Sequence, residues 1–268
     1  MKRYRSLALA LCAAAIAACD KNGVQNITAP TSGADIKFFN FGVAAPGVTF
    51  YANDQKLTAI SSSICQPPAD TTTTCRTAGN DSTAGTLSGS AGSGGLYNQI
   101  APGQYTLTGK IAAVPANHPT IASVTASLAD GKLYSYYISG IYDPVAKTAD
   151  AFVVEDPLPA TIDPTQAYVR FVNAVSNSTP MTLYAKSTTS GNEAPVGAAI
   201  AYKSAGTFTA MPGGVYDLNT RNTGSATNVI TRLAVSFIAG RVYTVTSRGD
   251  MVSTVTATKP ALDNTANR

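Results

Sequence analysis

The sequence is poor in the residues on which most enzyme and metal sites depend. Its 268 residues include one histidine, His118, and no tryptophan, and charged residues make up only 13% of the chain. A metal site around His118 would have to use carboxylates alone, and the Asp and Asn residues lack the spacing of a calcium loop. His118 lies in a turn-like stretch between two prolines, which favours an exposed loop histidine. We therefore predict no metal and no cofactor.

Catalytic serine chemistry is also poorly supplied. Ser93, within the run Ala91–Gly95, superficially matches the nucleophile elbow of hydrolases, which needs a strand before it and a helix after it. Here Gly/Ser sequence precedes the motif, and no Asp or Glu lies between Ser93 and His118 to complete the order nucleophile, acid, base. The same glycines are not followed by the Gly-Lys-Ser/Thr of a phosphate loop. We expect a flexible loop here and no enzymatic activity.

The chain has no apolar run of the length, about 20 residues, that spans a bilayer as a helix. Leu7–Ala18 is uncharged, follows the basic residues Lys2, Arg3 and Arg5, and ends in two alanines before Cys19. A basic start, a short apolar run and small residues are typical of a secretory signal. A cysteine directly after them resembles a bacterial lipoprotein signal. We predict a signal peptide at 1–18 and a lipid on the Cys19 thiol.

Removing this signal removes the apparent basicity of the chain. Lys and Arg number 19 against 15 Asp and Glu, and three of the bases lie in the signal, so 16 against 15 remain. A nearly neutral protein has no basic field to attract nucleic acid, so we predict no nucleic-acid partner. We expect the mature chain outside the cytoplasm, held in the bacterial cell envelope by its lipid. Asp20 does not decide between the two membranes or their faces.

Cysteine use agrees with export. Cys12 lies in the predicted signal and Cys19 would carry lipid, which leaves Cys65 and Cys75. A pair of cysteines in an oxidising compartment is most simply a disulfide. Free thiols or a metal are the alternatives, although two thiolates without a third cysteine or a nearby histidine do not make a zinc site.

An internal duplication organises the rest of the chain. Only two glutamates are present, whereas Thr, Tyr, Ser and Gly abound, a composition that favours strands over helices. Strand-like runs alternate with Pro-Gly and Gly turns, so we predict an all-β protein of two tandem antiparallel β-sandwiches, immunoglobulin-like in architecture. The matching segments are Ala34–Asn40 with Ala167–Asn173, Thr49–Ala52 with Thr182–Ala185, Ala101–Leu107 with Met211–Leu218 (with one inserted residue), and Gly131–Ser135 with Gly240–Thr244.

These matches set the expected domain boundaries. The first copy has a longer segment between two of its strands, and we assign the extra residues to an insertion within 53–95 that contains Cys65 and Cys75. Surface insertions often carry function, and whether this one is a binding loop stays open. The expected order is a signal at 1–18, a lipidated tether at 19–33, the first sandwich at 34–156, a linker at 157–166, the second sandwich at 167–258 and a tail at 259–268.

The repeated pattern, Val169–Ala174 followed by Pro212-Gly213 and Gly240–Val245, resembles a known family. It is similar to the bacterial cell-envelope domain of unknown function numbered four-three-nine-seven, commonly found in tandem on secreted proteins and lipoproteins. The similarity covers the second copy from 167 to 258 and, less closely, the first. The resemblance implies a β-sandwich and an envelope location, and it carries no catalytic residues.

Two further sequence features could indicate binding, but a structural role explains each more simply. Arg248-Gly249-Asp250 is an adhesion tripeptide, but Gly-Asp also suits a turn. The 13 tyrosines could stack on sugars, although burial in strands is their commoner use.

The sequence thus favours a non-enzymatic binding or structural module with a protein or glycan partner, and it identifies no ligand-binding residue. The alternative is a carbohydrate-binding lipoprotein that serves a polysaccharide-processing system.

Overall fold

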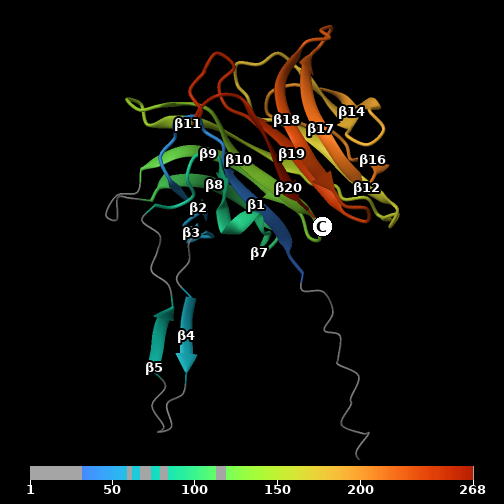
Figure 1. Ribbon diagram of the computed structural model, residues 1–268. Coiled ribbons are helices and arrows are strands. Elements are labelled where there is room, and N and C mark those ends of the chain that lie inside the picture. Colours follow the sequence, from blue (N-terminus) through green and yellow to red (C-terminus); the bar gives the residue numbers. More distant parts are fainter. Residues whose placement is uncertain (1–31, 59–61, 67–73, 79–83, 113–118, 268) are drawn as a thin grey trace, which may run out of the picture. The chain divides into compact units, whose positions relative to one another are not determined.

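The computed structural model describes residues 32–58, 62–66, 74–78, 84–112 and 119–267 (Figure 1). Among these residues the regular structure consists of strands, apart from one 3-10 turn, η2 (Gly92–Gly95). Gly33–Arg268 belong to one compact unit. The prediction of an all-β protein with two tandem sandwiches is therefore confirmed.

Two sheets form the first sandwich. One has the strand order β11-β10-β1-β6, with β7 also paired to β1, and the other has the order β3-β2-β8-β9. The strands are β1 (Ala34–Asn40), β2 (Val48–Ala52), β3 (Gln55–Lys56), β6 (Ser90–Ala91), β7 (Asn98–Ile100), β8 (Gly103–Ile111), β9 (Thr120–Leu128), β10 (Leu133–Asp143) and β11 (Thr148–Glu155).

The second sandwich repeats this topology. Its sheets have the orders β15-β12-β19-β20, with β16 also paired to β12, and β14-β13-β17-β18. In each copy one pair is parallel, β1 with β10 and β12 with β19, whereas the other pairs are antiparallel. The strands are β12 (Gln166–Asn173), β13 (Met181–Ser187), β14 (Glu193–Ile200), β15 (Ser204–Ala205), β16 (Thr209–Pro212), β17 (Gly214–Asn222), β18 (Asn228–Phe237), β19 (Val242–Arg248) and β20 (Ala261–Ala266).

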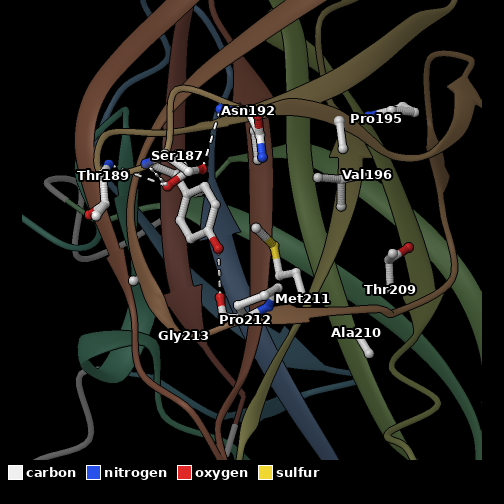
Figure 2. Close-up of a pocket in the computed structure, with 15 residues that line it drawn as sticks. Ser187, Thr189, Asn192, Pro195, Val196, Thr209, Ala210, Met211, Pro212 and Gly213 are labelled. Carbon is white, nitrogen blue, oxygen red and sulfur yellow. Dashed lines mark hydrogen bonds between the residues drawn. The ribbon is translucent and has the colours of Figure 1, made fainter.

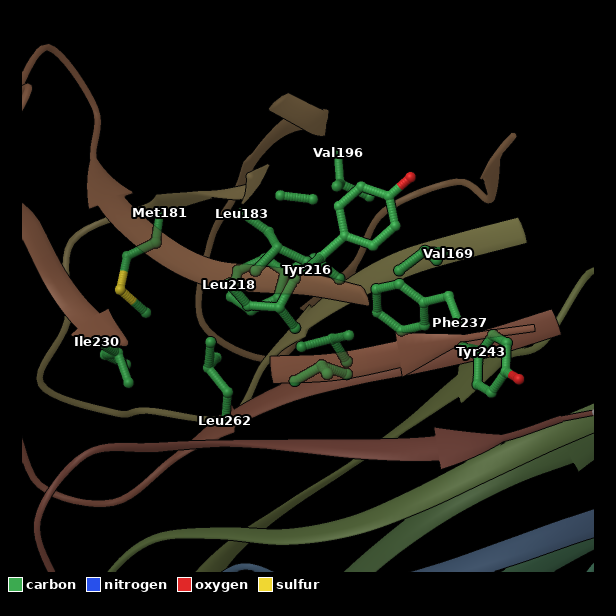
Figure 3. Close-up of a cluster of buried hydrophobic side chains, with 14 of the residues drawn as sticks. Val169, Met181, Leu183, Val196, Tyr216, Leu218, Ile230, Phe237, Tyr243 and Leu262 are labelled. Carbon is green, nitrogen blue, oxygen red and sulfur yellow. The ribbon is translucent and has the colours of Figure 1, made fainter. Parts of the chain in front are cut away.

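Each sandwich has its own apolar core. In the second, strands of both sheets contribute side chains that are almost fully buried, and Figure 3 shows them meeting between the sheets. Phe237 is 1% exposed, and its ring lies 5.1 Å from that of Tyr243 and 5.9 Å from that of Tyr216. The first core places Phe38 and Phe50 in a stack with centroids 5.0 Å apart. Burying a large apolar side chain contributes roughly 1.5–3 kcal/mol, so these rings are major contributors to stability.

Most of the predicted tail, 259–268, is a strand. Ala261–Ala266 make strand β20, which pairs with β19 along its length, so the second sandwich extends beyond residue 258. Leu262 is 3% exposed and completes the second core. The prediction failed because Ala, Asp and Asn dominate this strand and have low β propensity, leaving Leu262 as its one strong apolar signal.

The alignment of the two copies also needs one correction. The Tyr105 hydroxyl donates to the Ala101 carbonyl at 2.9 Å, and the Tyr216 hydroxyl donates to the Pro212 carbonyl at 2.7 Å. Each tyrosine thus reaches four residues back, which aligns Ala101 with Pro212. The inserted residue that the sequence comparison introduced is therefore unnecessary, and the Pro-Gly dipeptides of the two copies are offset by one position.

The extra segment of the first copy emerges from an edge strand. In the second copy, β14 continues through Gly197, which has a φ of +75° and lies at a register shift in the β13–β14 pair. In the first copy, Leu57 donates its N–H to Phe50 before the insertion, and Thr86 pairs with Val48 after it. The insertion therefore begins and ends where the second copy has the bulge at Gly197. An irregular strand ladder tolerates additional residues at such a position. It contains a hairpin of β4 (Ser62–Gln66) and β5 (Thr74–Ala78).

Candidate functional site

A groove runs along one open edge of the second sandwich. Figure 2 shows it between β14, on one sheet, and β16, on the other, with Met211 directed into it, and Tyr216 also lines it. Its volume is about 580 Å³, within the range of small-molecule sites. Both walls are edge strands, since among the described residues β14 pairs only with β13 and β16 only with β12. The fold positions this groove because each wall ends its sheet.

The groove has an apolar floor and a polar end without charge. Val196, Met211 and Tyr216 belong to its apolar lining. Ser187 and Asn192 belong to the polar end (Figure 2). None of the lining residues in the part of the chain that the structure describes is Asp, Glu, Lys, Arg or His. A charged ligand would lose its hydration there without gaining a counter-ion, so the chemistry of this groove suits an uncharged ligand.

The outer sheet of each sandwich has a tyrosine beside a basic side chain. The Arg221 guanidinium lies 4.2 Å from the centroid of the Tyr184 ring, and the Lys110 ammonium lies 4.5 Å from that of Tyr51. Both pairs lie at equivalent positions of the two copies. The strand registers show this, since Arg221 pairs with Thr182 as Lys110 pairs with Thr49. Cation–π contacts at exposed sites contribute about 0.5–1 kcal/mol, so each pair also has a structural use.

A third candidate is the interface between the two sandwiches, which has an aromatic centre. Phe39, Phe41, Tyr137 and Phe152 of the first sandwich form one buried cluster with Val172 and Ala174 of the second. The Tyr137 ring is stacked 4.7 Å from Phe39 and 5.0 Å from Phe152. Phe39 of β1 and Val172 of β12 belong to this cluster, whereas Phe38 of β1 and Phe171 of β12 belong to the sandwich cores. Both faces of each strand are therefore buried.

Beside this cluster lies a buried ion pair. The Arg170 and Asp156 side chains are both fully buried and form a salt bridge between the second and first sandwiches. Arg170 also donates to the Thr244 hydroxyl and to the Glu155 carbonyl, each at 2.9 Å. The other Asp156 oxygen accepts from the hydroxyls of Tyr97 and Ser135, each at 2.7 Å. The hydrogen bonds satisfy both charges, as buried ions require.

The interface is reciprocal. Lys37 of β1 donates to the Ala266 carbonyl of β20 at 2.5 Å, and Arg170 of β12 donates to the Glu155 carbonyl of β11. The strand registers show that these positions are equivalent. Lys37 pairs with Ser135, and its counterpart Arg170 pairs with Thr244. Glu155 pairs with Tyr134, and its counterpart Ala266 pairs with Tyr243. In an isologous pairing, residue i contacts j and j contacts i. The two copies therefore meet through the same surface, as the subunits of a homodimer do.

Within each copy, an aromatic ring lies under the basic side chain. The Lys37 ammonium is 4.3 Å from the Tyr97 ring centroid, and the Arg170 guanidinium is 4.8 Å from that of Phe208. Burial raises the pKa of the Tyr97 hydroxyl, and the Asp156 carboxylate that accepts its hydrogen bond raises it further. Tyr97 therefore stays protonated and remains a donor to Asp156.

The two halves differ in charge. The residue after Glu155 is Asp156, whereas the residue after Ala266 is Asn267, which donates to Tyr97 at 3.3 Å. Lys37 is 2% exposed and has no ion pair among the residues that the structure describes. Burial lowers the pKa of Lys37 to about 8, although the Asp156 carboxylate opposes this shift.

The predicted site residues lie apart from these features. Cys19 and His118 fall outside the described residues. Ser93 lies in η2 with a φ of 50°, and its hydroxyl is exposed, 3.4 Å from the Asn98 side chain. Cys65 and Cys75 are register partners in the β4–β5 hairpin. Cα atoms directly opposite each other in antiparallel strands are about 4.5–5.5 Å apart, within the range that a disulfide spans.

The Arg248-Gly249-Asp250 segment is engaged within the fold. Arg248 forms an ion pair with Asp263 and lies 5.8 Å from the Phe41 ring. Gly249 has a φ of +105°, which favours glycine, and the Asp250 side chain accepts from Asn177 at 2.7 Å. The turn interpretation of this tripeptide agrees with these contacts.

Sequence reasoning missed Lys37, Arg170 and Asp156 as a group. Lys37 and Arg170 each lie inside an otherwise apolar strand whose sequence continues without alternation, as in Phe38-Phe39. Such runs are typical of strands buried on both faces, and a base inside one needs a buried partner. The sequence thus indicated that each base needs a buried partner, but not which residue supplies it. The groove leaves no such signal, because it forms where two strands end their sheets.

The described residues contain no helix long and apolar enough to cross a membrane. In the same part of the chain, no three His, Cys, Asp or Glu side chains gather as metal ligands. No family model and no curated protein matches this chain.

Proposed function

We propose that this chain is a lipid-anchored protein of the bacterial cell envelope that acts as a non-enzymatic binding module. The signal-like start and Cys19 support the anchor, and a membrane is thus one partner. The similarity to the envelope domain numbered four-three-nine-seven supports the location. The reciprocal interface supports a module in which the two sandwiches move together. The mature chain would lie outside the cytoplasm.

The groove of the second sandwich is the binding surface that we propose. The observation that carries this proposal is the uncharged lining of a hollow of about 580 Å³ between two edge strands. Its ligand would be uncharged, with an apolar part over Met211 and Tyr216 and polar groups toward Ser187 and Asn192. Free backbone groups of β14 and β16 would add hydrogen bonds.

Calorimetric titration of the purified chain with uncharged oligosaccharides and uncharged short peptides tests this proposal. Ala210→Arg introduces a charge at an exposed lining position of β16 and should abolish saturable binding. Val145→Arg is the matched control, since Val145 is 92% exposed in the first sandwich and lines no part of this groove. Saturable binding that both variants retain equally would place the ligand elsewhere.

The anchor has a separate test. Cys19→Ser should release the protein from the membrane fraction or leave it unprocessed, and metabolic labelling with a clickable fatty acid should fail on this variant. A Cys19→Ser protein that remained membrane-bound and normally processed would contradict the lipid anchor. Intact mass of the membrane-extracted wild-type chain should show the acyl chains directly.

Carbohydrate binding for a polysaccharide-processing system is the second candidate function. The Tyr184–Arg221 and Tyr51–Lys110 pairs on the outer sheets favour it, because each combines an apolar ring and a polar hydroxyl with a neighbouring hydrogen-bond donor. In the same titrations, Tyr184→Ala should weaken oligosaccharide binding if the outer sheet is used. If Ala210→Arg alone weakens it, the groove is the sugar site.

A further inference from the structure

The two halves of the interface between the sandwiches share a geometry and differ by one negative charge. Arg170 and Lys37 occupy equivalent positions, and each donates to a main-chain carbonyl of the opposite copy. Arg170 has the Asp156 carboxylate as counter-ion, while the position equivalent to Asp156 holds the neutral amide of Asn267. Two cations and one anion are therefore buried together, and the surplus charge belongs to Lys37.

The surroundings of Lys37 offer its ammonium little compensation. Tyr97 from the chain before β7 presents its ring, and β20 presents the Ala266 carbonyl. The charged groups that act on Lys37 are Asp156, after β11, and Arg170, on β12. Their charges oppose each other and already form an ion pair. An ammonium that loses its hydration in such a place is disfavoured relative to the free amine.

We propose that Lys37 makes the interface between the two sandwiches pH-responsive: the neutral amine fits this interface better than the ammonium, so the sandwiches associate more tightly as the pH rises. The absence of a second carboxylate at residue 267 creates this response. The response requires only protonation and deprotonation of Lys37, so it is independent of the ligand proposed for the groove.

The sign follows from proton linkage. Burial lowers the pKa of Lys37 from 10.5 to about 8, so the unfolded chain binds more protons than the folded chain between these values. Stability therefore rises with pH across this window. With these two values, the folding equilibrium constant should increase roughly 20–30-fold between pH 7 and pH 9.5. Tyrosine ionisation in the unfolded chain acts in the opposite direction, so wild type must be compared with a variant.

The experiment measures urea unfolding of the purified chain at pH 7.0, 8.0, 9.0 and 9.5 by far-UV circular dichroism. Lys37→Met keeps the length of the side chain without its charge and should lack the Lys37 contribution. The ratio of wild-type to variant folding constants should then rise by at least tenfold between pH 7 and pH 9.5. Parallel pH curves for the two proteins would overturn the proposal.

Asn267→Asp gives a second, independent arm. It places a carboxylate at residue 267, equivalent to that of Asp156 in the other half of the interface. The ammonium of Lys37 then becomes the favoured form. This variant should be more stable than wild type at pH 7, and the alkaline rise should disappear. A rise as steep as in wild type would overturn the proposal even if Lys37→Met failed to fold.

Discussion

Replacing Asp156 by Asn should destabilise the protein strongly. The substitution makes the two halves of the interface alike and leaves the Arg170 guanidinium buried without a counter-ion. Breaking a buried ion pair in this way costs about 3–5 kcal/mol. For a unit of this size, 1 kcal/mol corresponds to about 2–4 °C in Tm, so we expect Asp156→Asn to lower Tm by roughly 6–20 °C. Differential scanning calorimetry at pH 7 measures this directly.

The neighbouring residue provides a matched control. Glu155 forms an ion pair with Lys132 at 2.9 Å, and these side chains are 41% and 53% exposed. Exposed pairs contribute about 0–1 kcal/mol, so Glu155→Gln should shift Tm by a few degrees at most. Equal losses of stability for Asp156→Asn and Glu155→Gln would contradict a stabilising role for the buried Arg170–Asp156 pair.

Three further predictions concern the core, a turn and the hairpin. Phe237→Ala removes a ring that is 1% exposed and should cost about 3–5 kcal/mol in urea unfolding; a cost below 1 kcal/mol would contradict its place in the core. Gly249→Ala forces a Cβ onto a φ of +105° and against the Lys259 carbonyl oxygen, so it should destabilise by more than about 1 kcal/mol, measured by thermal unfolding. Cys65 and Cys75 should resist alkylation until reductant is added, as read by intact mass; immediate alkylation of both would exclude the disulfide.

Much of the fold could be predicted from local pattern. Alternation in β13, with Met181, Leu183 and Ala185 buried and Thr182 and Tyr184 half-buried, is typical of a strand with one face on a core. The repeated segments then indicated that the same sandwich occurs twice. These features depend on neighbours along the chain and on turn residues, which a sequence displays directly.

The interface and the groove could not be predicted in the same way. The partners of Lys37 and Arg170 in the interface, Ala266 and Asp156, lie more than ten residues away in the sequence. Strand β20 was missed because only Leu262 among its residues is strongly apolar. The groove depends on which strands end their sheets, and that follows from tertiary pairing. Pairing between distant segments carries no local sequence period.

One reciprocal interface joins the two sandwiches into a single module. Scanning calorimetry of the purified chain at pH 7 tests it most directly. We expect one unfolding transition whose calorimetric and van't Hoff enthalpies agree, because neither sandwich can unfold without exposing the aromatic cluster around Tyr137 and the buried Arg170. Two separate transitions, with Asp156→Asn leaving both unchanged, would contradict it.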